Sequence, residues 1–361
     1  MAEQKKPFLQ SLQVLRFMAA SLVLVGHVQH EVADLKISGS GTFQEFTPVV
    51  WGAGVDIFFV ISGFIIYLLT HKHFAERGYA GEFLKRRLIR VAPAYWVFTT
   101  LMLAAMTVFH SRISHNGVDP VHVLASYAFL PWPRADGDLM PILSLGWTLN
   151  YEMLFYLLFA SVLALPRNRA MMVLSGIFIL GVAVNRWVPE PLWALRFWTK
   201  PIVLEFLMGI GLAHLYLSGV RVSTRVGATM FVVSLAVMVG VKAAGLETLW
   251  PRPLWAGLPA LLTCAGLVLA TELGAGSRLY GALAHGGDIS YSLYLSHGFT
   301  VNVVALFWQK LGLHMPWIFV LVASLASLVV AELAYRFCEQ PILAFLHSRT
   351  QFRPALVQSP T

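Results

Sequence analysis

The chain has 361 residues, a length that usually gives a soluble protein two or three domains, but its composition excludes a soluble protein. Charged side chains make up 12% of the residues, about half of the roughly 25% that globular domains carry. Hydrophobic residues make up 57%, and the mean hydropathy is +0.69. Because so few charges do not cover a soluble surface, the sequence predicts an integral membrane protein.

The net charge of +8 and the isoelectric point near 9.6 do not indicate a nucleic-acid partner. In a polytopic membrane protein the same excess of Lys and Arg lies in the cytoplasmic loops and fixes orientation. The two cysteines, Cys264 and Cys338, predict neither a disulfide framework nor a zinc site. His71 and His73 are two residues apart and diverge on a helix, so no metal site is expected there.

Ten stretches are long and apolar enough to cross a bilayer core of about 30 Å as helices. In chain order they are residues 11–30, 49–70, 92–110, 143–164, 170–188, 201–218, 225–244, 253–271, 288–308 and 315–336. The predicted fold class is therefore all-α: a polytopic protein of about ten transmembrane helices forming one domain over residues 1–346. Residues 347–361, with two prolines and few apolar groups, are expected to form a loose tail.

Ten spans place both termini on the same side of the membrane, and the basic residues predict which side. With the termini in the cytoplasm, sixteen Lys and Arg residues lie inside and nine outside, which favours this orientation. The longest connection, about residues 111–142, is too short for a separate catalytic domain. The chemistry is therefore expected within the helical bundle.

Of the ionisable residues inside the predicted spans, six are the candidates for function: Arg16, His27, Asp56, Glu152, Glu205 and His297. An ionised group at mid-bilayer costs about 2.5 to 3.5 kcal/mol, so each such residue is a candidate functional residue. Arg16 and His27 are eleven residues apart, which places them on one face of a helix and roughly 16 Å apart along its axis.

In the predicted orientation His27, Asp56 and Glu152 lie at similar depths in the outer half of the membrane. A carboxylate beside a histidine fixes its tautomer and raises its basicity, an arrangement suited to taking a proton from a hydroxyl. Other interpretations remain open at this point. Arg16 can extend its side chain to lipid headgroups, His27 can be an interfacial histidine, and the carboxylates can pair with arginine to pack helices. Glu205 is expected to be structural.

A basic segment precedes the third predicted span. Lys85, Arg86, Arg87 and Arg90 come just before Pro93, and Arg86 and Arg90 share one face of a helix at i and i+4. Such a face suits phosphate groups. From charge alone, an orientation signal that contacts acidic membrane lipid is an equal alternative.

Six segments together resemble the acyltransferase family 3 membrane proteins, in the order in which that family has them. They are L-R-F-M-A-A-S-L-V-L-V-G-H (15–27), G-V-D-I-F-F-V-I-S-G-F-I-I (54–66), R-R-L-I-R-V-A-P (86–93), G-W-T-L-N-Y-E-M-L-F-Y (146–156), D-I-S-Y-S-L-Y-L-S-H (288–297) and Y-R-F-C-E-Q-P (335–341). They extend over almost the whole chain.

The resemblance implies a ten-span O-acyltransferase of the bacterial inner membrane. Such proteins take an acyl group, usually acetyl, from cytoplasmic acyl-CoA and transfer it to a sugar hydroxyl of a polysaccharide or its lipid-linked precursor. The family's functional positions match Arg16, His27, Asp56 and Glu152, and its basic pair matches Arg86 and Arg90. We expect acetyl-CoA as donor, with its phosphates on Arg86, Arg87, Arg90 and Arg16, and no metal.

Two departures from the family pattern concern the first motif. The Asp often found three residues before the Arg is Gln13 here, and the Gly that often follows the Arg is Phe17. With these two residues the motif is closest to the exopolysaccharide-modifying branch.

The residues expected to contact the acceptor are Trp51, Trp147, Tyr151 and His297. Acylation of a lipid, peptide or small molecule is the alternative reaction, and a secondary transporter is the alternative outside enzymes, although no inverted repeat is evident.

Overall fold

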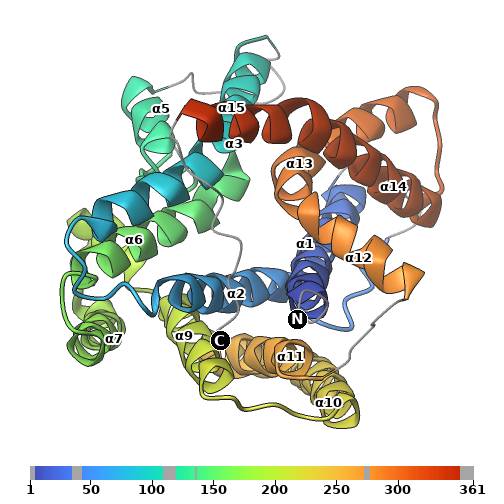
Figure 1. The fold of residues 1–361 in the computed structure, drawn as a ribbon. Coiled ribbons are helices and arrows are strands. Elements are labelled where there is room, and N and C mark those ends of the chain that lie inside the picture. The colour runs from blue at the N-terminus through green and yellow to red at the C-terminus, as the bar shows by residue number, and fades with distance from the viewer. Residues whose placement is uncertain (1–4, 35–42, 109–118, 135, 272–276, 350–361) are drawn as a thin grey trace. The chain divides into compact units, whose positions relative to one another are not determined.

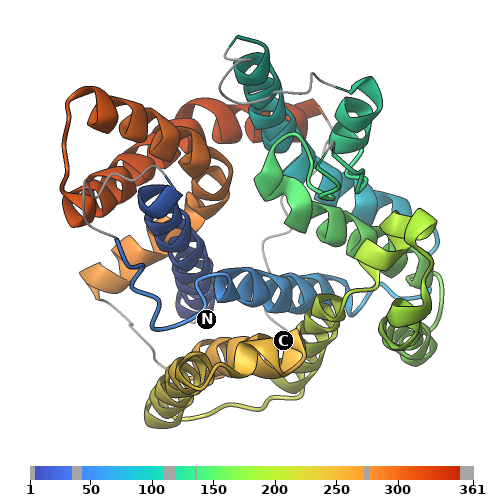
Figure 2. The same ribbon diagram turned by 180° about the vertical axis from the view of Figure 1, so that it is seen from behind.

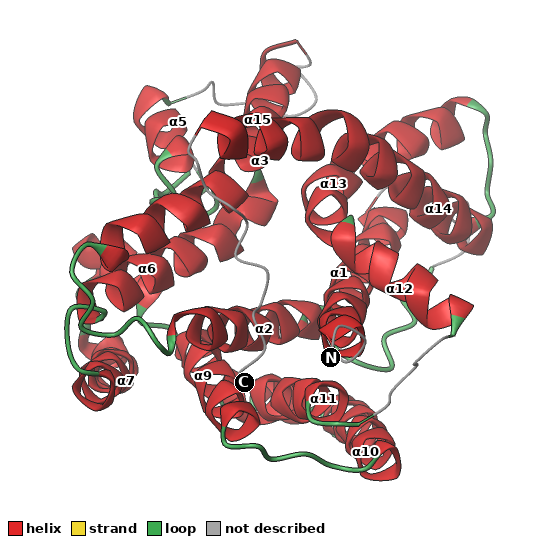
Figure 3. Ribbon diagram, in the orientation of Figure 1, coloured by secondary structure: helices red, strands yellow, loops and turns green. Residues whose placement is uncertain are grey.

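The computed structural model describes residues 5–34, 43–108, 119–134, 136–271 and 277–349, and side chains from residue 10 onward. Over these residues the chain consists of helices joined by loops (Figure 3), and extended pairing is limited to an isolated bridge between Val222 and Ala270. The longer helices are α1 (Lys5–Asp34), α2 (Ala53–Thr70), α3 (Tyr79–Val108), α5 (Pro120–Tyr127), α6 (Trp147–Val162), α7 (Arg167–Val184), α8 (Trp193–Trp198), α9 (Leu204–Leu217), α10 (Thr224–Ala243), α11 (Leu258–Val268), α12 (Arg278–Asp288), α13 (Ser290–Lys310), α14 (Pro316–Ala334) and α15 (Gln340–Arg349).

Seven short elements connect or extend these helices. They are the 3₁₀ turns η1 (Ser144–Gly146), η2 (Asn185–Trp187), η3 (Glu190–Leu192), η4 (Pro201–Val203) and η5 (Leu246–Thr248), and the π-helical turns η6 (Pro253–Gly257) and η7 (Tyr335–Glu339). A π turn inserts one extra residue into a helix and changes the direction of every side chain that follows. Arg252 directly precedes η6 and Glu339 ends η7, and each of these residues takes part in an ion pair described below.

Each of the ten predicted spans falls on a helix. In the described part of the chain, seven helical segments are long and apolar enough to cross a membrane: Gln10–Ala33, Ala53–Thr70, Tyr79–Val108, Arg167–Trp187, Glu190–Leu217, Thr224–Ala243 and Pro316–Arg349. The remaining three stretches, on α6, Pro253–Val268 and α13, are shorter or less apolar. Ten transmembrane helices and cytoplasmic termini therefore stay predictions.

Exposed apolar side chains on the long helices indicate a multi-pass membrane protein. Val232 on α10 is 61% exposed, Leu321 on α14 is 59% exposed and Leu180 on α7 is 64% exposed, each among several similar neighbours. Contiguous apolar surface of this kind is unfavourable in water. It is the surface that a helix presents to lipid.

The first of two compact units comprises the described parts of Met1–Leu68 and Met208–Cys338. Within it α1 packs against α11, α12, α13 and α14, and α10 packs against α11. Figures 1 and 2 show α13 and α14 side by side. Aliphatic residues on one face of α1, including Leu24 and Val28, form a core with Leu293 of α13 and Phe319 of α14. This packing fixes α1, which carries two of the predicted site residues.

Two glycines allow close helix approaches on α1. A Cβ atom at Gly287 of α12 would overlap the backbone carbonyl of Gln13, and one at Gly54 of α2 would overlap that of Ala19. Glycine is the residue that permits such close backbone contact. Gly287 thereby places Asp288 beside the start of α1, and Gly54 brings the start of α2 against its middle.

The second unit comprises Leu69–Leu207 and the described part of Glu339–Leu356. Its core is aromatic: the rings of Phe155 and Phe206 stack with centroids 4.3 Å apart, and Phe159 contacts both Phe155 and Phe83. The basic segment and the third predicted span form one continuous helix, α3, which includes Pro93.

The end of the chain differs from the prediction in one detail. Helix α15 continues to Arg349, so the first three residues of the predicted tail are helical. Residues 350–361 lie outside the described residues.

Candidate active site

Helix α1 carries Arg16 and His27 without interruption. The arginine is half-buried and the histidine is exposed. At 1.5 Å and 100° per residue, the two side chains leave the same face of the helix roughly 16 Å apart. The helical geometry predicted for this pair is therefore present.

His27 contacts a second histidine from α13. Its Nδ1 atom lies 2.8 Å from Nε2 of His297, and the two ring planes differ by 17° with centroids 5.1 Å apart, so the rings meet edge to edge through these two nitrogens. His297 is 1% exposed, and its Nδ1 atom lies 2.9 Å from the carbonyl oxygen of Leu293, one helical turn earlier. The structure thus places His297 behind His27, whereas the sequence predicted a direct substrate contact for it.

Asp56 forms an ion pair that the sequence did not predict. Its side chain is fully buried, and both carboxylate oxygens accept hydrogen bonds from Arg252, from Nε at 2.9 Å and from Nη2 at 2.7 Å. The same Nη2 donates to the carbonyl oxygen of Gly52 at 3.1 Å. The predicted role of Asp56 in orienting His27 differs from this geometry, in which His27 is held by His297.

Arg252 is the main residue that sequence reasoning missed. It immediately precedes η6, and its guanidinium also lies 5.6 Å from the ring centroid of Trp255. The only prediction made for Arg252 from the sequence is its place among the nine Lys and Arg residues assigned to the outer side of the membrane. Its position directly before a proline and an apolar stretch was the one available signal.

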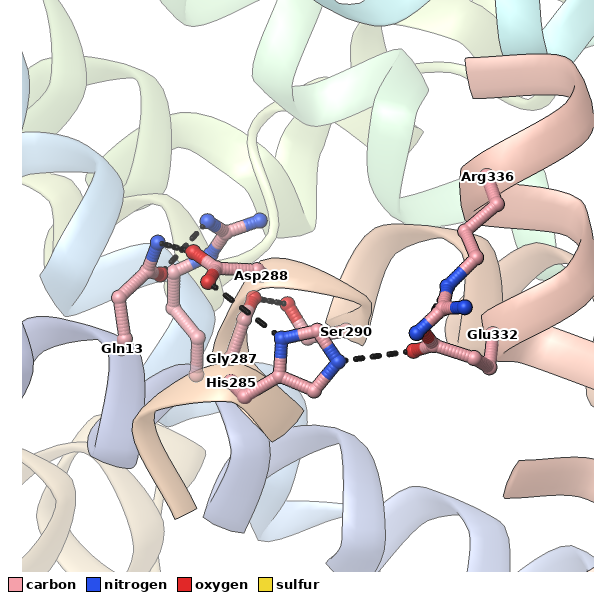
Figure 4. Close-up of polar contacts among 8 residues, drawn as sticks. Gln13, His285, Gly287, Asp288, Ser290, Glu332 and Arg336 are labelled. Atoms are coloured by element: carbon pink, nitrogen blue, oxygen red, sulfur yellow. Dashed lines mark hydrogen bonds and ion pairs between the residues drawn. The ribbon is translucent and has the colours of Figure 1, made fainter. Parts of the chain in front are cut away.

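A polar network joins the start of α1 to α12 and α14. Gln13 accepts a hydrogen bond from Arg16 at 2.9 Å and donates one to Asp288 (Figure 4). His285 lies between two carboxylates, with Nε2 2.9 Å from Glu332 and Nδ1 3.9 Å from Asp288. The side chain of Gln13 therefore links the guanidinium of Arg16 to the carboxylate of Asp288.

A cavity of about 300 Å³ lies on the other side of α1. Its lining is apolar and includes Met18, Leu22, Val25 and Trp51. The α1 residues among these, Met18, Leu22 and Val25, project between about 180° and 240° around the helix axis from Arg16. The cavity is therefore separate from the Arg16–His27 face, and Trp51, for which a sugar contact was predicted, lines this apolar space instead.

In the second unit, α6 carries the other predicted residues. Glu152 accepts a hydrogen bond from Tyr156 one turn later. Tyr151 is 1% exposed, stacks on Phe197 at 4.3 Å and donates to its carbonyl oxygen at 2.7 Å. The predicted stacking of Tyr151 on a sugar differs from this buried position, because its ring faces are covered by protein. Trp147 is half-buried beside it.

Two of the three predicted phosphate-binding arginines on α3 already contact carboxylates. Arg86 pairs with Glu82 one turn earlier, and Arg90 pairs with Glu339, which is 2% exposed at the end of η7. Arg87 differs: in the described residues no carboxylate lies within ion-pair distance of it, and its guanidinium lies 5.7 Å from the ring of Phe83. Of the three arginines, Arg87 is therefore the one at which carboxylates compete least with a phosphate-bearing ligand.

No cluster of three or more His, Cys, Asp or Glu residues suited to a metal ion occurs in the described ranges. The site instead contains the exposed imidazole of His27, whose Nδ1 contacts the buried imidazole of His297. This arrangement presents one ring nitrogen for proton transfer or nucleophilic attack. Together with the apolar helix surfaces, it places a candidate acid–base site in the helices of a multi-pass membrane protein.

The comparisons with known proteins agree with that class. An acyltransferase domain matches residues 9–336, and the chain belongs to the acyltransferase family 3. It is 35% identical over 306 residues to the exopolysaccharide production protein ExoZ of Rhizobium meliloti (strain 1021), covering 84% of this chain and 92% of that protein. No solved structure matches the chain. The protein is an acyltransferase of the membrane.

Proposed function

We propose that the protein transfers an acyl group, acetyl in the simplest case, from acyl-CoA to a hydroxyl of an exopolysaccharide or its lipid-linked precursor. The family supports acyl transfer, and the name of the relative from Rhizobium meliloti supports an exopolysaccharide acceptor. The proposed location is the bacterial inner membrane, with the donor reaching the site from the cytoplasm. The observation that carries the proposal is the exposed imidazole of His27 on the same helix face as Arg16.

In the proposed reaction, His27 acts at Nε2 because His297 contacts Nδ1. The imidazole takes the proton of the acceptor hydroxyl while the oxygen attacks the thioester carbon. A carbon–oxygen bond forms and the carbon–sulfur bond breaks. The leaving thiolate takes the proton back from Nε2, giving an ester and free CoA. Transient attachment of the acyl group to Nε2 is the alternative route with the same products.

Arg16 is proposed to bind the phosphates of the donor by charge-assisted hydrogen bonds. Its distance of roughly 16 Å from His27 along α1 suits the long, thin arm that joins those phosphates to the thioester. Arg86, Arg87 and Arg90 are proposed as further phosphate contacts; among the described residues, no carboxylate pairs with Arg87.

Transfer of labelled acetyl from acetyl-CoA by the purified protein in detergent micelles tests the proposal. The acceptor is deacetylated exopolysaccharide, and the products are free thiol and acceptor-bound label. We expect His27→Ala to bind acetyl-CoA as tightly as the wild type and to lose transfer by about 10² to 10⁴-fold. Near-normal transfer by folded His27→Ala contradicts the mechanism. Label recovered on lipid or peptide instead of polysaccharide contradicts the acceptor.

A further inference from the structure

We infer that His297 is a positioning residue that holds His27 in the tautomer with its proton on Nδ1, so that Nε2 presents its lone pair to the reactants. This inference rests on the proposed function of His27. It starts from a chain of two contacts: Leu293 carbonyl oxygen to His297 Nδ1 at 2.9 Å, and His297 Nε2 to His27 Nδ1 at 2.8 Å.

The carbonyl oxygen of Leu293 fixes which atom is the donor in both hydrogen bonds. A carbonyl only accepts hydrogen bonds, so Nδ1 of His297 carries the proton that it donates. A neutral imidazole has one N–H and one lone pair, which leaves Nε2 of His297 as an acceptor. The atom opposite it, Nδ1 of His27, must then be the donor. The remaining nitrogen of His27, Nε2, has the lone pair.

The burial of His297 favours this arrangement of protons over the opposite one. His297 is 1% exposed on α13, so an extra proton on its ring would place a charge inside the protein. His27 is exposed, and the positive charge that it gains during proton transfer lies toward the reactants. In that charged state Nδ1–H still donates to His297, and a hydrogen bond from a charged donor is the stronger one. The buried ring therefore supports the active ring without taking its proton.

The same order serves both possible chemistries. A general base and a nucleophile each need the lone pair on the nitrogen that faces the substrate. The opposite tautomer would put a proton there and block both. In serine hydrolases an acidic residue holds the catalytic histidine in the correct tautomer, and the wrong tautomer slows catalysis by orders of magnitude. Here a backbone carbonyl and a neutral histidine have the equivalent role.

Two substitutions at one position test the inference. His297→Phe keeps a ring of similar size but removes the acceptor, and His297→Gln places an amide oxygen near the position of Nε2. We expect His297→Phe to lower kcat about 10²-fold at an unchanged KM for acetyl-CoA, and His297→Gln to recover most of that loss. His314→Phe, at an exposed histidine between α13 and α14, is the matched control and keeps full activity.

Nitrogen-15 NMR of histidine-labelled protein gives a readout that a merely structural role would not change. The signals of His27 are assigned by their loss in His27→Ala. We expect a protonated Nδ1 and an unprotonated Nε2 in the wild type, and the Nε2-protonated form to increase in His297→Phe. An Nε2-protonated His27 in the wild type overturns the inference even if the variants fail to fold.

The kinetic outcomes separate this inference from the proposed function. If His27→Ala is inactive and His297→Phe retains wild-type kcat, the positioning role is wrong and the function of His27 stands. If the wild type transfers no acetyl while His27 shows the expected tautomer, the proposed function fails and the positioning role stands. Equal losses in folded His297→Phe and His297→Gln also overturn the inference, because the amide oxygen should replace the acceptor.

Discussion

Replacing Arg252 by Gln removes the partner of a buried charge. Asp56 is fully buried, and both of its oxygens accept hydrogen bonds from the guanidinium. A glutamine is too short to reach both oxygens and carries no charge. The variant therefore leaves an ionised carboxylate inside the helices without compensation, and the protein either protonates it or loses packing around it.

The magnitude follows from the different exposure of the two partners. Breaking a buried ion pair from one side costs about 3 to 5 kcal/mol, and because the side chain of Arg252 is 31% exposed we expect about 3 kcal/mol for Arg252→Gln. Asp56→Asn leaves a partly exposed guanidinium that solvent reaches, so about 1 to 2 kcal/mol is expected. The double variant contains two neutral amides. Its loss should be smaller than the sum of the single losses by about 1 to 3 kcal/mol.

Reversible unfolding in mixed micelles by titration with sodium dodecyl sulfate measures these free energies, and acetyl transfer is followed on the same preparations. Arg186→Gln is the control, because this exposed arginine contacts the ring of Trp187, and it should change stability by no more than about 0.5 kcal/mol. Strictly additive losses, or an Arg252→Gln variant as stable as the wild type, refute the reasoning. Loss of kcat in Asp56→Asn at full stability would instead favour a direct role of Asp56 at His27.

Two further predictions concern the second unit. Arg87→Gln should raise the KM for acetyl-CoA at unchanged stability, whereas Arg90→Gln should lower stability because it breaks an ion pair to a glutamate that is 2% exposed. Thermal unfolding and donor titration of both variants separate these effects, and equal behaviour contradicts the assignment. In a cysteine-free background, a cysteine at Lys85 should react with a membrane-impermeant maleimide only from the cytoplasmic side and one at Asp138 only from the outside. The reverse pattern contradicts the orientation that the basic residues predict.

The helices themselves were largely predictable from apolar periodicity. All ten predicted stretches fall on helices, because a membrane span requires a long apolar segment whatever its neighbours are. Their limits were less predictable. The third predicted span begins at residue 92, yet α3 begins at Tyr79 and includes the basic segment 85–90, since Pro93 removes one hydrogen bond without ending the helix. Likewise, the last apolar stretch continues through η7 into α15.

The sequence singled out candidate site residues, His297 among them, but did not predict which residues contact each other. His27 and Asp56 stand out because ionisable groups are rare in apolar spans. Their partners, His297 and Arg252, are 270 and 196 positions away, and no local pattern relates residues at such separations. The π turn that follows Arg252 adds a second difficulty, because a prediction based on 3.6 residues per turn assigns wrong directions beyond it.

The glutamine at position 13 illustrates how a departure from the family pattern is explained by contacts. A carboxylate at this position would accept a hydrogen bond from Arg16 but would also face the carboxylate of Asp288, and two like charges at hydrogen-bond distance repel each other. A carboxamide accepts from the guanidinium with its oxygen and donates to Asp288 with its nitrogen. Gln13 therefore joins the guanidinium of Arg16 to a carboxylate on α12 through two hydrogen bonds. Gly287 brings the backbone of α12 against that of α1 at this point. The close helix contact therefore places Asp288 within hydrogen-bonding reach of the glutamine at position 13.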